Sequence, residues 1–496
     1  MNTSNSNSKV KMYFFPYIAG GHLLPMIDIA RFFASSHPNV QATIITTPKT
    51  ALLFQSSIDH DREAGYNISF HTLDLGLPDE DENFLDTLSH DQRTKVLTAF
   101  KNLKKPLEML LTDSRPDCFV CDLMHSWTLD IADDASVPWV VFHSTSLFLL
   151  WAEDCLTRLK PQHNVGSDEE PFLLGGSEMN DQVWFTRLRL PVWHRANNGE
   201  TKDEFLPINL IKKTCKRSYA VVVNSCSDLE GEYRSAAQNA VGASRVCMVG
   251  PASLYSTRNN SDSKVQSTVK ESILEWLGSK EVNSVVYVSF GSEANLSKEQ
   301  FHEIAYGLEG SGQPFIWVHL RPNLFKDQSE DGWFPEGFEA RIKESNQGLV
   351  IKGWAPQLVI LNHVSLGAFV THCGWNSSLE GISNGVPVIT CPLTLDQFYI
   401  ESFMVDVMKV GIRVGNEEWV VSNAPPKVTV TRDKLEAAVR KMMSGGEEVD
   451  EMRRKVKEYA KKCEMAIQQG GSSYQDAYSL VEELKALKEG NGKENI

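Results

Sequence analysis

The feature that most constrains the fold of this chain is an alternation of short apolar runs with longer segments of helical apolar spacing. The short runs are rich in β-branched and aromatic residues and are bounded by Gly, Pro, Ser or Asp, as in "ATIITTP" and "VPWVVFHS". Segments such as 25–35 and 90–111, whose apolar residues recur at helical spacing, lie between them. Strands that alternate with helices are typical of βαβ units, in which helices cover both faces of a parallel sheet. The sequence therefore predicts the α/β class.

This alternation occurs twice along the chain. A polar stretch, 252–268, has no periodic apolar face, and the second series of strands begins after it at "SVVYVSFGS". A chain of 496 residues is also too long for one ordinary core. We predict a first domain over 1–251, a linker over 252–270, a second domain over 271–470 and a C-terminal helix over 471–496.

Composition and charge exclude several classes of protein. A content of 42% hydrophobic and 23% charged residues is that of a soluble globular protein. The net charge of −15 argues against nucleic acid or an anionic membrane as the main partner, because both attract basic surfaces. No apolar stretch approaches the roughly 20 residues of a membrane span, and Pro16 interrupts the first apolar run.

The cysteines point to a reducing compartment. They are nine in number and scattered, which fits reduced thiols better than a disulfide framework. Cys118 and Cys121 form a C-x-x-C, but they lie in a predicted buried strand and no second pair completes a zinc site. We expect a cytoplasmic protein.

One stretch, "THCGWNSSLEGISNGVPVITCP" over 371–392, places polar groups where a strand gives way to a helix. In open parallel sheets ligands bind beyond the carboxyl ends of the strands, and the free N–H groups of a following helix suit phosphates. Gly374 would let the backbone approach an anion closely. His372, Asn376 and Ser377 add side-chain donors. The stretch predicts a phosphate site.

Polar and aromatic residues on both sides of this stretch extend the predicted site. Glu380 lies one turn after Asn376 on the same helix face, and its natural partners are vicinal hydroxyls of a ribose. Trp354 offers a flat surface to a base and Gln357 an amide, whereas Asp396 and Gln397 follow the next strand and could bind sugar hydroxyls. Singly, such residues are more often core or surface residues, so the prediction of a nucleotide-sugar site depends on their joint arrangement.

The joint arrangement resembles a known motif. Over 354–397, "WAPQ", "HCGWNS", "E", "GVP", "P" and "DQ" resemble the plant secondary product glycosyltransferase box of family 1 UDP-sugar-dependent glycosyltransferases. "VNSCSDLE", "VGPASL" and "VVYVSFGS" also look like landmarks of that family, so the resemblance covers nearly the whole chain. It implies a GT-B fold, in which two Rossmann-like domains with parallel sheets face a central cleft. The acceptor would bind to the first domain and the UDP-sugar to the second, and the last helix would pack back on the first.

The resemblance also implies roles for individual residues. Gln397 favours glucose, because a Gln at this place usually goes with UDP-glucose and a His with UDP-galactose. Cys391 and Thr394 differ from the commonest Trp and Phe, which concerns the shape of the site near the sugar. By match to the motif, the expected contacts are Trp354 with uracil, Gln357 and Glu380 with ribose, Ser292, His372, Gly374, Asn376 and Ser377 with the pyrophosphate, and Trp375, Asp396 and Gln397 with the sugar. Ala355 is also expected in the UDP-sugar site, and Ser144 beside the sugar.

A general base is expected in the first domain. His22 follows the first strand in "GGHLLP", where the residues alone also allow a helix-capping His and match no phosphate-loop pattern. The resemblance implies that His22 accepts the proton of the acceptor hydroxyl, and that Asp122, at the end of the fourth strand, fixes its tautomer and stabilises the imidazolium.

The implied reaction is one displacement that inverts the anomeric carbon and needs neither a metal nor a cofactor. Its partners would be a UDP-sugar and a small hydrophobic hydroxylated acceptor of triterpenoid, steroid or flavonoid type, bound by a monomer. The acceptor loops are expected at 80–95, 143–155 and 165–205. Galactosyl transfer stays open, as does glucuronosyl transfer, for which Arg31 is a candidate partner of the sugar carboxylate.

Two other classes of protein are disfavoured. A non-catalytic UDP-sugar binder would not need His22 and Asp122. A Rossmann oxidoreductase would need a G-x-G-x-x-G after a strand, which is absent from that context.

Overall fold

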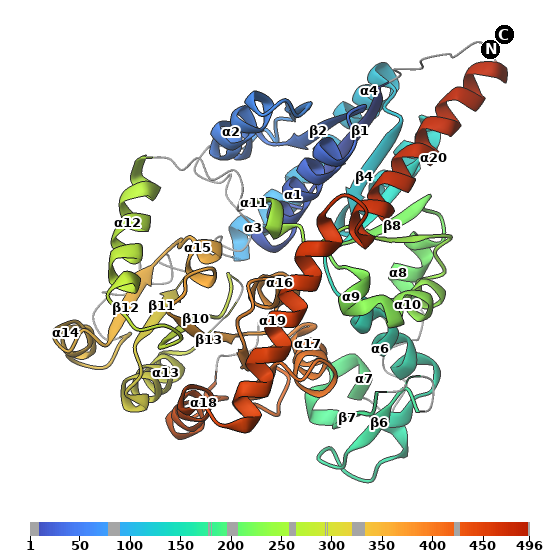
Figure 1. Ribbon diagram of the computed structural model, residues 1–496. Helices are drawn as coiled ribbons and strands as arrows, with labels where there is room; N and C mark the ends of the chain where they lie inside the picture. The colour runs from blue at the N-terminus through green and yellow to red at the C-terminus, as the bar shows by residue number, and fades with distance from the viewer. Residues whose placement is uncertain are drawn as a thin grey trace. The chain divides into compact units, whose positions relative to one another are not determined.

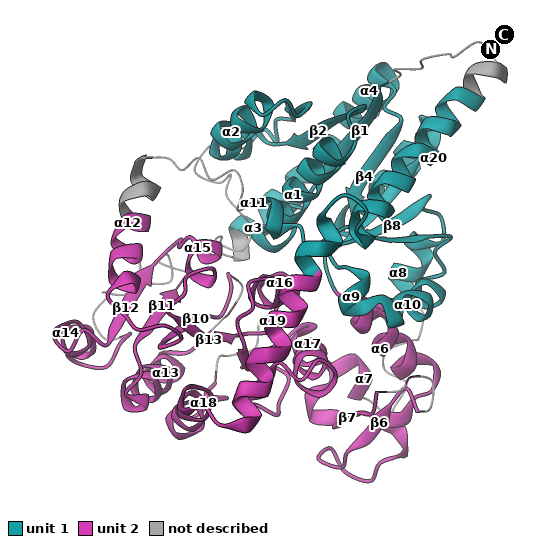
Figure 2. Cartoon of the chain, viewed as in Figure 1, with its two compact units in different colours: residues 1–145, 209–263, 463–496 teal, residues 146–208, 264–462 magenta. Residues whose placement is uncertain are grey.

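The chain folds into two compact units. The computed structural model describes residues 9–77, 90–176, 179, 181–195, 207–256, 264–292, 294, 296–319, 333–420 and 427–494. Unit 1 comprises Met1–Thr145, Asn209–Ser263 and Cys463–Ile496, and unit 2 comprises Ser146–Ile208 and Lys264–Lys462 (Figures 1 and 2).

Unit 1 is built on a seven-stranded parallel sheet of order β3-β2-β1-β4-β5-β8-β9. Every residue of β4 and β5 is buried, as expected for near-continuous apolar strands covered on both faces. The strands are β1 (Val10–Phe15), β2 (Val40–Thr46), β3 (Ile68–Thr72), β4 (Cys118–Asp122), β5 (Trp139–His143), β8 (Ala220–Val223) and β9 (Val246–Met248).

Helices flank this sheet, and the last of them returns from the end of the chain. The helix α20 packs beside α1 and β9. Its Ser473 donates to the carbonyl of Gly250 (2.6 Å), and its Asp476 accepts from the N–H of Met248 (2.8 Å). The helices are α1 (Gly20–Ser36), α2 (Pro48–Glu63), α3 (His90–Phe100), α4 (Lys104–Ser114), α5 (Leu129–Asp134), α8 (Pro207–Cys215), α9 (Ser227–Glu230), α10 (Arg234–Val241), α11 (Ser253–Ser256) and α20 (Ser472–Glu494).

Unit 2 contains a six-stranded parallel sheet of order β12-β11-β10-β13-β14-β15 and an antiparallel pair, β6-β7. The strands are β6 (Phe172–Leu174), β7 (Val183–Phe185), β10 (Val285–Ser289), β11 (Phe315–His319), β12 (Gly348–Lys352), β13 (Leu366–Thr371), β14 (Val388–Thr390) and β15 (Gly411–Arg413). The helices are α6 (Leu147–Arg158), α7 (Val192–Arg195), α12 (Lys264–Gly278), α13 (Lys298–Ser311), α14 (Phe338–Glu344), α15 (Gln357–Leu361), α16 (Trp375–Ser383), α17 (Gln397–Ser402), α18 (Arg432–Ser444) and α19 (Glu447–Ile467), the last of which ends in unit 1.

The division differs from the predicted domains in two places. Residues 146–208 group with unit 2, because α6 packs on the region of α17: the rings of Phe148 and Phe403 are 5.2 Å apart, and Tyr399 donates to Glu153 (2.9 Å). The predicted linker also ends too late, since α12 begins at Lys264. Its apolar stripe becomes visible in the sequence only when the segment is followed to residue 278.

All nine cysteines are free and buried, including Cys118 and Cys121 in β4. Burial raises the pKa of Cys215, Cys247 and Cys391 to about 12. Within the described ranges, no helix has both the length and the apolar character needed to cross a bilayer.

Candidate active site

The polar stretch of unit 2 forms a turn between β13 and α16. Gly374 is the N-cap of α16, and Cys373 before it has a φ of 67°, a left-handed conformation that is uncommon for a non-glycine residue. One face of the helix is partly exposed and the other is buried. Asn376, Ser377 and Glu380 lie on the partly exposed face, and Trp375, Ser378 and Leu379 lie on the buried one. One face of the first two turns of α16 therefore carries the residues that are predicted to bind the phosphates and the ribose.

Two glycines make room for the ring of His372. A Cβ on Gly291 would lie 2.6 Å from His372 Nε2, and one on Gly374 would lie 2.5 Å from the same atom. From the sequence, Gly374 was expected to let an anion approach the backbone. In the structure, the absence of a side chain at Gly374 makes room for the imidazole of His372. Burial lowers the pKa of His372 from its ordinary value of 6.5, so the ring is neutral at pH 7 and offers an N–H rather than a positive charge.

The two residues expected to hold the ribose contact each other. Gln357, at the start of α15, donates through Nε2 to Glu380 Oε2 (2.6 Å) and lies 3.4 Å from Ser377 Oγ. Its Oε1 accepts from the hydroxyl of Tyr287 in β10 (3.0 Å). Tyr287 is therefore a positioning residue that sequence reasoning missed, since nothing distinguishes it from the apolar residues of its strand.

Trp354 is the exposed member of the site. Its side chain is 52% exposed, which is unusual for Trp and leaves the indole face available for stacking on a base. Ala355 is buried, and its carbonyl accepts from the N–H of Gln357 (2.8 Å). Trp375, by contrast, is only 3% exposed, and its ring lies 6.1 Å from that of Phe403. Most of Trp375 thus packs inside unit 2.

The residues expected at the sugar lie at the start of α17. Asp396 is the N-cap and is partly exposed, whereas Gln397 is buried. Gln397 Oε1 accepts from the N–H groups of Leu393 (2.8 Å) and Thr394 (3.0 Å), which fixes the side chain against its own loop. Ser292 is partly exposed directly after Gly291.

In unit 1 the structure joins the predicted base to its predicted partner. His22 is in the first turn of α1, and its Nδ1 lies 2.9 Å from Asp122 Oδ2 at the end of β4. The side chain of His22 is 27% exposed and that of Asp122 only 1%. Ser144 Oγ lies 3.4 Å from His22 Nε2. Ser144, expected at the sugar, is thus placed beside the base.

Asp122 is held in its ionised form. Burial acts to raise its pKa, but the charge and hydrogen bond of His22, together with a hydrogen bond from the N–H of Met124 (2.9 Å), lower it overall. A carboxylate at Nδ1 keeps the imidazole proton on that atom, so the Nε2 lone pair is the one that can accept a proton. The geometry is that of an oriented general base.

One candidate from the sequence is excluded. Arg31 is buried and donates to Asp61 (2.6 Å) and Asp28 (2.8 Å), so its charge is already neutralised and the proposal that it recruits a sugar carboxylate is wrong. Of the expected acceptor loops, residues 80–89, 177, 178, 180 and 196–205 lie outside the described residues.

Comparison with known sequences shows which proteins the chain resembles. The profile of a family described as "UDP-glucoronosyl and UDP-glucosyl transferase" matches residues 259–418. An abscisate beta-glucosyltransferase of Phaseolus angularis is 41% identical over 96% of this chain and 97% of its own length. A soyasapogenol B glucuronide galactosyltransferase of Glycine max is 36% identical over 97% of this chain and 96% of its own.

A solved structure has a similar fold over nearly the whole chain. The crystal structure of Glycyrrhiza uralensis UGT73P12, complexed with glycyrrhetinic acid 3-O-monoglucuronide, superposes with a TM-score of 0.88. The two sequences are 36% identical, and the match covers 98% of each chain.

Proposed function

The chain belongs to the family of plant UDP-glycosyltransferases, and on that premise we propose that it transfers glucose from UDP-glucose to a hydroxyl group of a small hydrophobic plant metabolite. The GT-B fold and the class of enzyme that the sequence resemblance implied are confirmed. The observation that carries the proposal is the contact between His22 and Asp122, because a protein that only bound UDP-sugars would not need an oriented base.

The proposed chemistry is a single displacement at the anomeric carbon. His22 Nε2 takes the proton of the acceptor hydroxyl as the oxygen attacks, and Asp122 stabilises the resulting imidazolium. The bond to the UDP oxygen breaks on the opposite side, so the configuration inverts. Assistance of this kind typically contributes about 10²–10⁴-fold to the rate.

The departing UDP carries the negative charge that develops in this step. The N-terminal turn of α16 offers backbone N–H groups and the positive end of the helix dipole, and His372, Asn376, Ser377 and Ser292 add polar groups nearby. These groups can stabilise the leaving diphosphate without a cation. We therefore propose that the reaction needs no metal and no cofactor, with the UDP-sugar as co-substrate.

Glucose is the proposed sugar because Gln397 stands at the position that resembles the glucose-using motif, and because the Phaseolus relative is named a glucosyltransferase. Galactose is the second candidate, since the soybean relative is named a galactosyltransferase. Glucuronic acid is disfavoured, because Arg31, the candidate partner of its carboxylate, is already paired with Asp61 and Asp28.

The proposed acceptor is of triterpenoid, steroid or flavonoid type. The name of the soybean relative and the ligand of the Glycyrrhiza structure favour a triterpenoid glycoside or aglycone among these. A cytoplasmic location and a monomeric state stay predictions.

The experiment is a matrix of donors and acceptors. Purified protein is incubated with UDP-glucose, UDP-galactose or UDP-glucuronic acid and with hydroxylated triterpenoids, steroids and flavonoids, and products are identified by mass spectrometry and NMR. We expect β-glucosides from UDP-glucose. Transfer from none of the three donors would refute the proposal, and a product with retained α configuration would refute the mechanism.

A further inference from the structure

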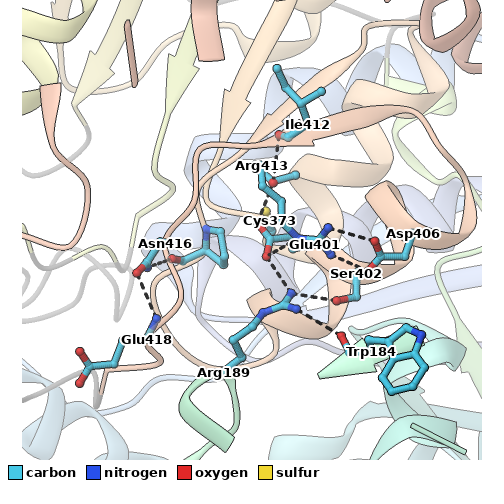
Figure 3. A network of polar contacts seen from close by, with 12 residues as sticks. Trp184, Arg189, Cys373, Glu401, Ser402, Asp406, Ile412, Arg413, Asn416 and Glu418 are labelled. Carbon is cyan, nitrogen blue, oxygen red and sulfur yellow. Dashed lines mark hydrogen bonds and ion pairs between the residues drawn. The ribbon is translucent and has the colours of Figure 1, made fainter. Parts of the chain in front are cut away.

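A buried charged residue lies beneath the sugar-binding end of unit 2. Glu401 is in α17, one helical turn after Gln397, and is fully buried. Its Oε2 accepts from Arg189 Nη2 (2.8 Å) and lies 3.3 Å from Arg413 Nε (Figure 3). Its Oε1 accepts from the hydroxyl of Thr390 (2.7 Å). Both oxygens of one carboxylate are therefore bound from three different segments of the chain.

Glu401 ties together the two ends of the loop that carries Asp396 and leads into Gln397, two of the expected sugar ligands. This sugar loop comprises residues 391–396, between the end of β14 at Thr390 and the start of α17 at Gln397. The hydrogen bond from Thr390 to Glu401 ties the strand before the loop to the helix after it. Within the loop, Leu395 has a φ of 54°, an uncommon conformation for Leu that persists only where neighbouring structure holds it.

A second segment binds the sugar loop from its side. Asn416 donates to the carbonyl of Pro392, the N–H of Val420 to that of Leu393 (3.1 Å), and Trp419 Nε1 to that of Leu395 (3.0 Å). Three of the six loop carbonyls are thus bound by 416–420.

Glu401 and the segment 416–420, which both hold the sugar loop, also contact the segment 184–195. Arg189 also donates to Ser402 Oγ (2.9 Å) and to the carbonyl of Trp184 (3.4 Å). Trp419 accepts through its carbonyl from Arg195 (2.9 Å), and its N–H donates to Leu188 (2.9 Å). Since 184–195 belongs to the region expected to form acceptor loops, the contacts join an acceptor-side segment to the donor-sugar loop.

Stability alone is a poor explanation for this network. Taking charges out of water is costly, and buried ion pairs can often be replaced by apolar residues without loss of stability. Removing one partner is different, because it leaves the other charge buried and unpaired. Figure 3 also shows Cys373 beside Glu401, which places the carboxylate next to the turn before α16. Glu401 and its partners thus lie next to both the turn before α16, which includes Cys373, and the sugar loop.

We infer that Arg189, Thr390 and Glu401 are positioning residues for the donor sugar, which hold Asp396 and Gln397 in the geometry that binds the hexose. This inference rests on the proposed function, and it concerns the sugar rather than the nucleotide, because the expected UDP ligands are Ser292 and residues of the segment 354–380. Loss of the network should therefore weaken binding of UDP-glucose more than binding of UDP.

Two variants test this, one at an uncharged partner of Glu401 and one at a charged partner. Thr390→Val removes the hydroxyl and keeps the shape. Arg189→Met removes one guanidinium, while Arg413, which also pairs with Asp406, still lies beside Glu401. In each we expect KM for UDP-glucose to rise about 10-fold, the effect of roughly one lost hydrogen bond, with a smaller change in the Kd for UDP measured by calorimetry. Thr390→Ser, which restores the hydroxyl, should restore KM.

Arg187→Met is the matched control. Arg187 lies in the same short helix, Arg187–Arg189, its side chain is equally buried, and its partner is Asp168 (2.8 Å) instead of Glu401. We expect KM and Kd to stay at wild-type values in this variant. A rise in KM equal to that of Arg189→Met would overturn the inference, as would an equal loss of UDP and UDP-glucose affinity or unchanged KM in both test variants.

The two proposals fail separately. A wild-type protein that transfers no sugar refutes the proposed function, and the calorimetric comparison of UDP with UDP-glucose then still decides the inference. An active wild type with unaffected Thr390→Val and Arg189→Met refutes the inference alone.

Discussion

The ring of His372 fills the space that a side chain on Gly291 would need. A Cβ on Gly291 would lie 2.6 Å from the imidazole, closer than real Cβ contacts allow. Gly291 also has a φ of 70°, which other residues rarely adopt. The glycine after β10 and the histidine after β13 are therefore matched to each other across adjacent strands.

Gly291→Ala should displace His372 and weaken binding of UDP. The matched control is Gly312→Ala, since Gly312 has the same φ of 70° but nothing within 4 Å of an added Cβ. Both variants carry the backbone strain, which costs about 1 kcal/mol, and only Gly291→Ala disturbs the ring. We expect UDP affinity, measured by calorimetry, to fall about 10-fold in Gly291→Ala, the loss of roughly one hydrogen bond. Equal affinities in the two variants would contradict the role of His372.

His22→Ala should greatly slow transfer and leave UDP binding intact. The proposed base acts on the acceptor, so we expect kcat to fall about 10²–10⁴-fold. Asp122→Asn should also lower kcat, because the asparagine neither fixes the tautomer nor stabilises the imidazolium. Steady-state kinetics and UDP calorimetry on the same preparations check this, and a parallel loss of UDP binding would assign His22 a structural role.

Acidification should destabilise unit 1 through His125. This residue is buried and stacked on Phe15 (4.5 Å between ring centroids), and burial lowers its pKa from 6.5 to about 4. Between these values the unfolded chain binds a proton that the folded chain does not, so stability is lost as the pH falls from 6.5 toward 4. The single group accounts for about 2 kcal/mol between pH 7 and pH 5.

His125→Phe keeps an aromatic ring against Phe15 and removes the titrating imidazole. We expect its melting temperature to depend less on pH between 7 and 5 than that of the wild type, measured by circular dichroism. The exposed His60 gives the control, His60→Phe, whose pH dependence should match the wild type. Identical slopes in all three proteins would show that His125 does not contribute.

Removal of divalent cations should not affect the rate. The leaving diphosphate is proposed to be stabilised by the N-terminal turn of α16 and by neutral His372, which need no metal. Activity in excess EDTA should therefore equal activity in magnesium. Loss of activity in EDTA that manganese restores would contradict this mechanism.

The parts of the fold that could be predicted are those with a local pattern. β4 and β5 are continuous apolar runs, and the turn from β13 into α16 carries glycine and polar residues in a fixed order. The start of α12 was missed because its first residues are polar, and its stripe appears only over several turns.

Apart from His22 and Asp122, which the family resemblance paired, long-range partners could not be predicted. Nothing near Arg31 in the sequence indicates that Asp61 neutralises it, and nothing near Arg189 indicates Glu401, which follows 212 residues later. A charged residue within the apolar run "QFYIESFMV" was the one indication that Glu401 has a buried partner. Residues 146–208 were assigned to the first domain for the same reason, since their contacts with α17 have no local trace.

Because all nine thiols are free and buried, their reaction with a thiol reagent reports on unfolding. Six of the nine, Cys118, Cys121, Cys215, Cys226, Cys247 and Cys463, belong to unit 1, and Cys155, Cys373 and Cys391 belong to unit 2. A maleimide added under mild denaturation will label only the half that has opened. Peptide mapping of the adducts therefore gives the order in which the two halves come apart, with no engineered probe.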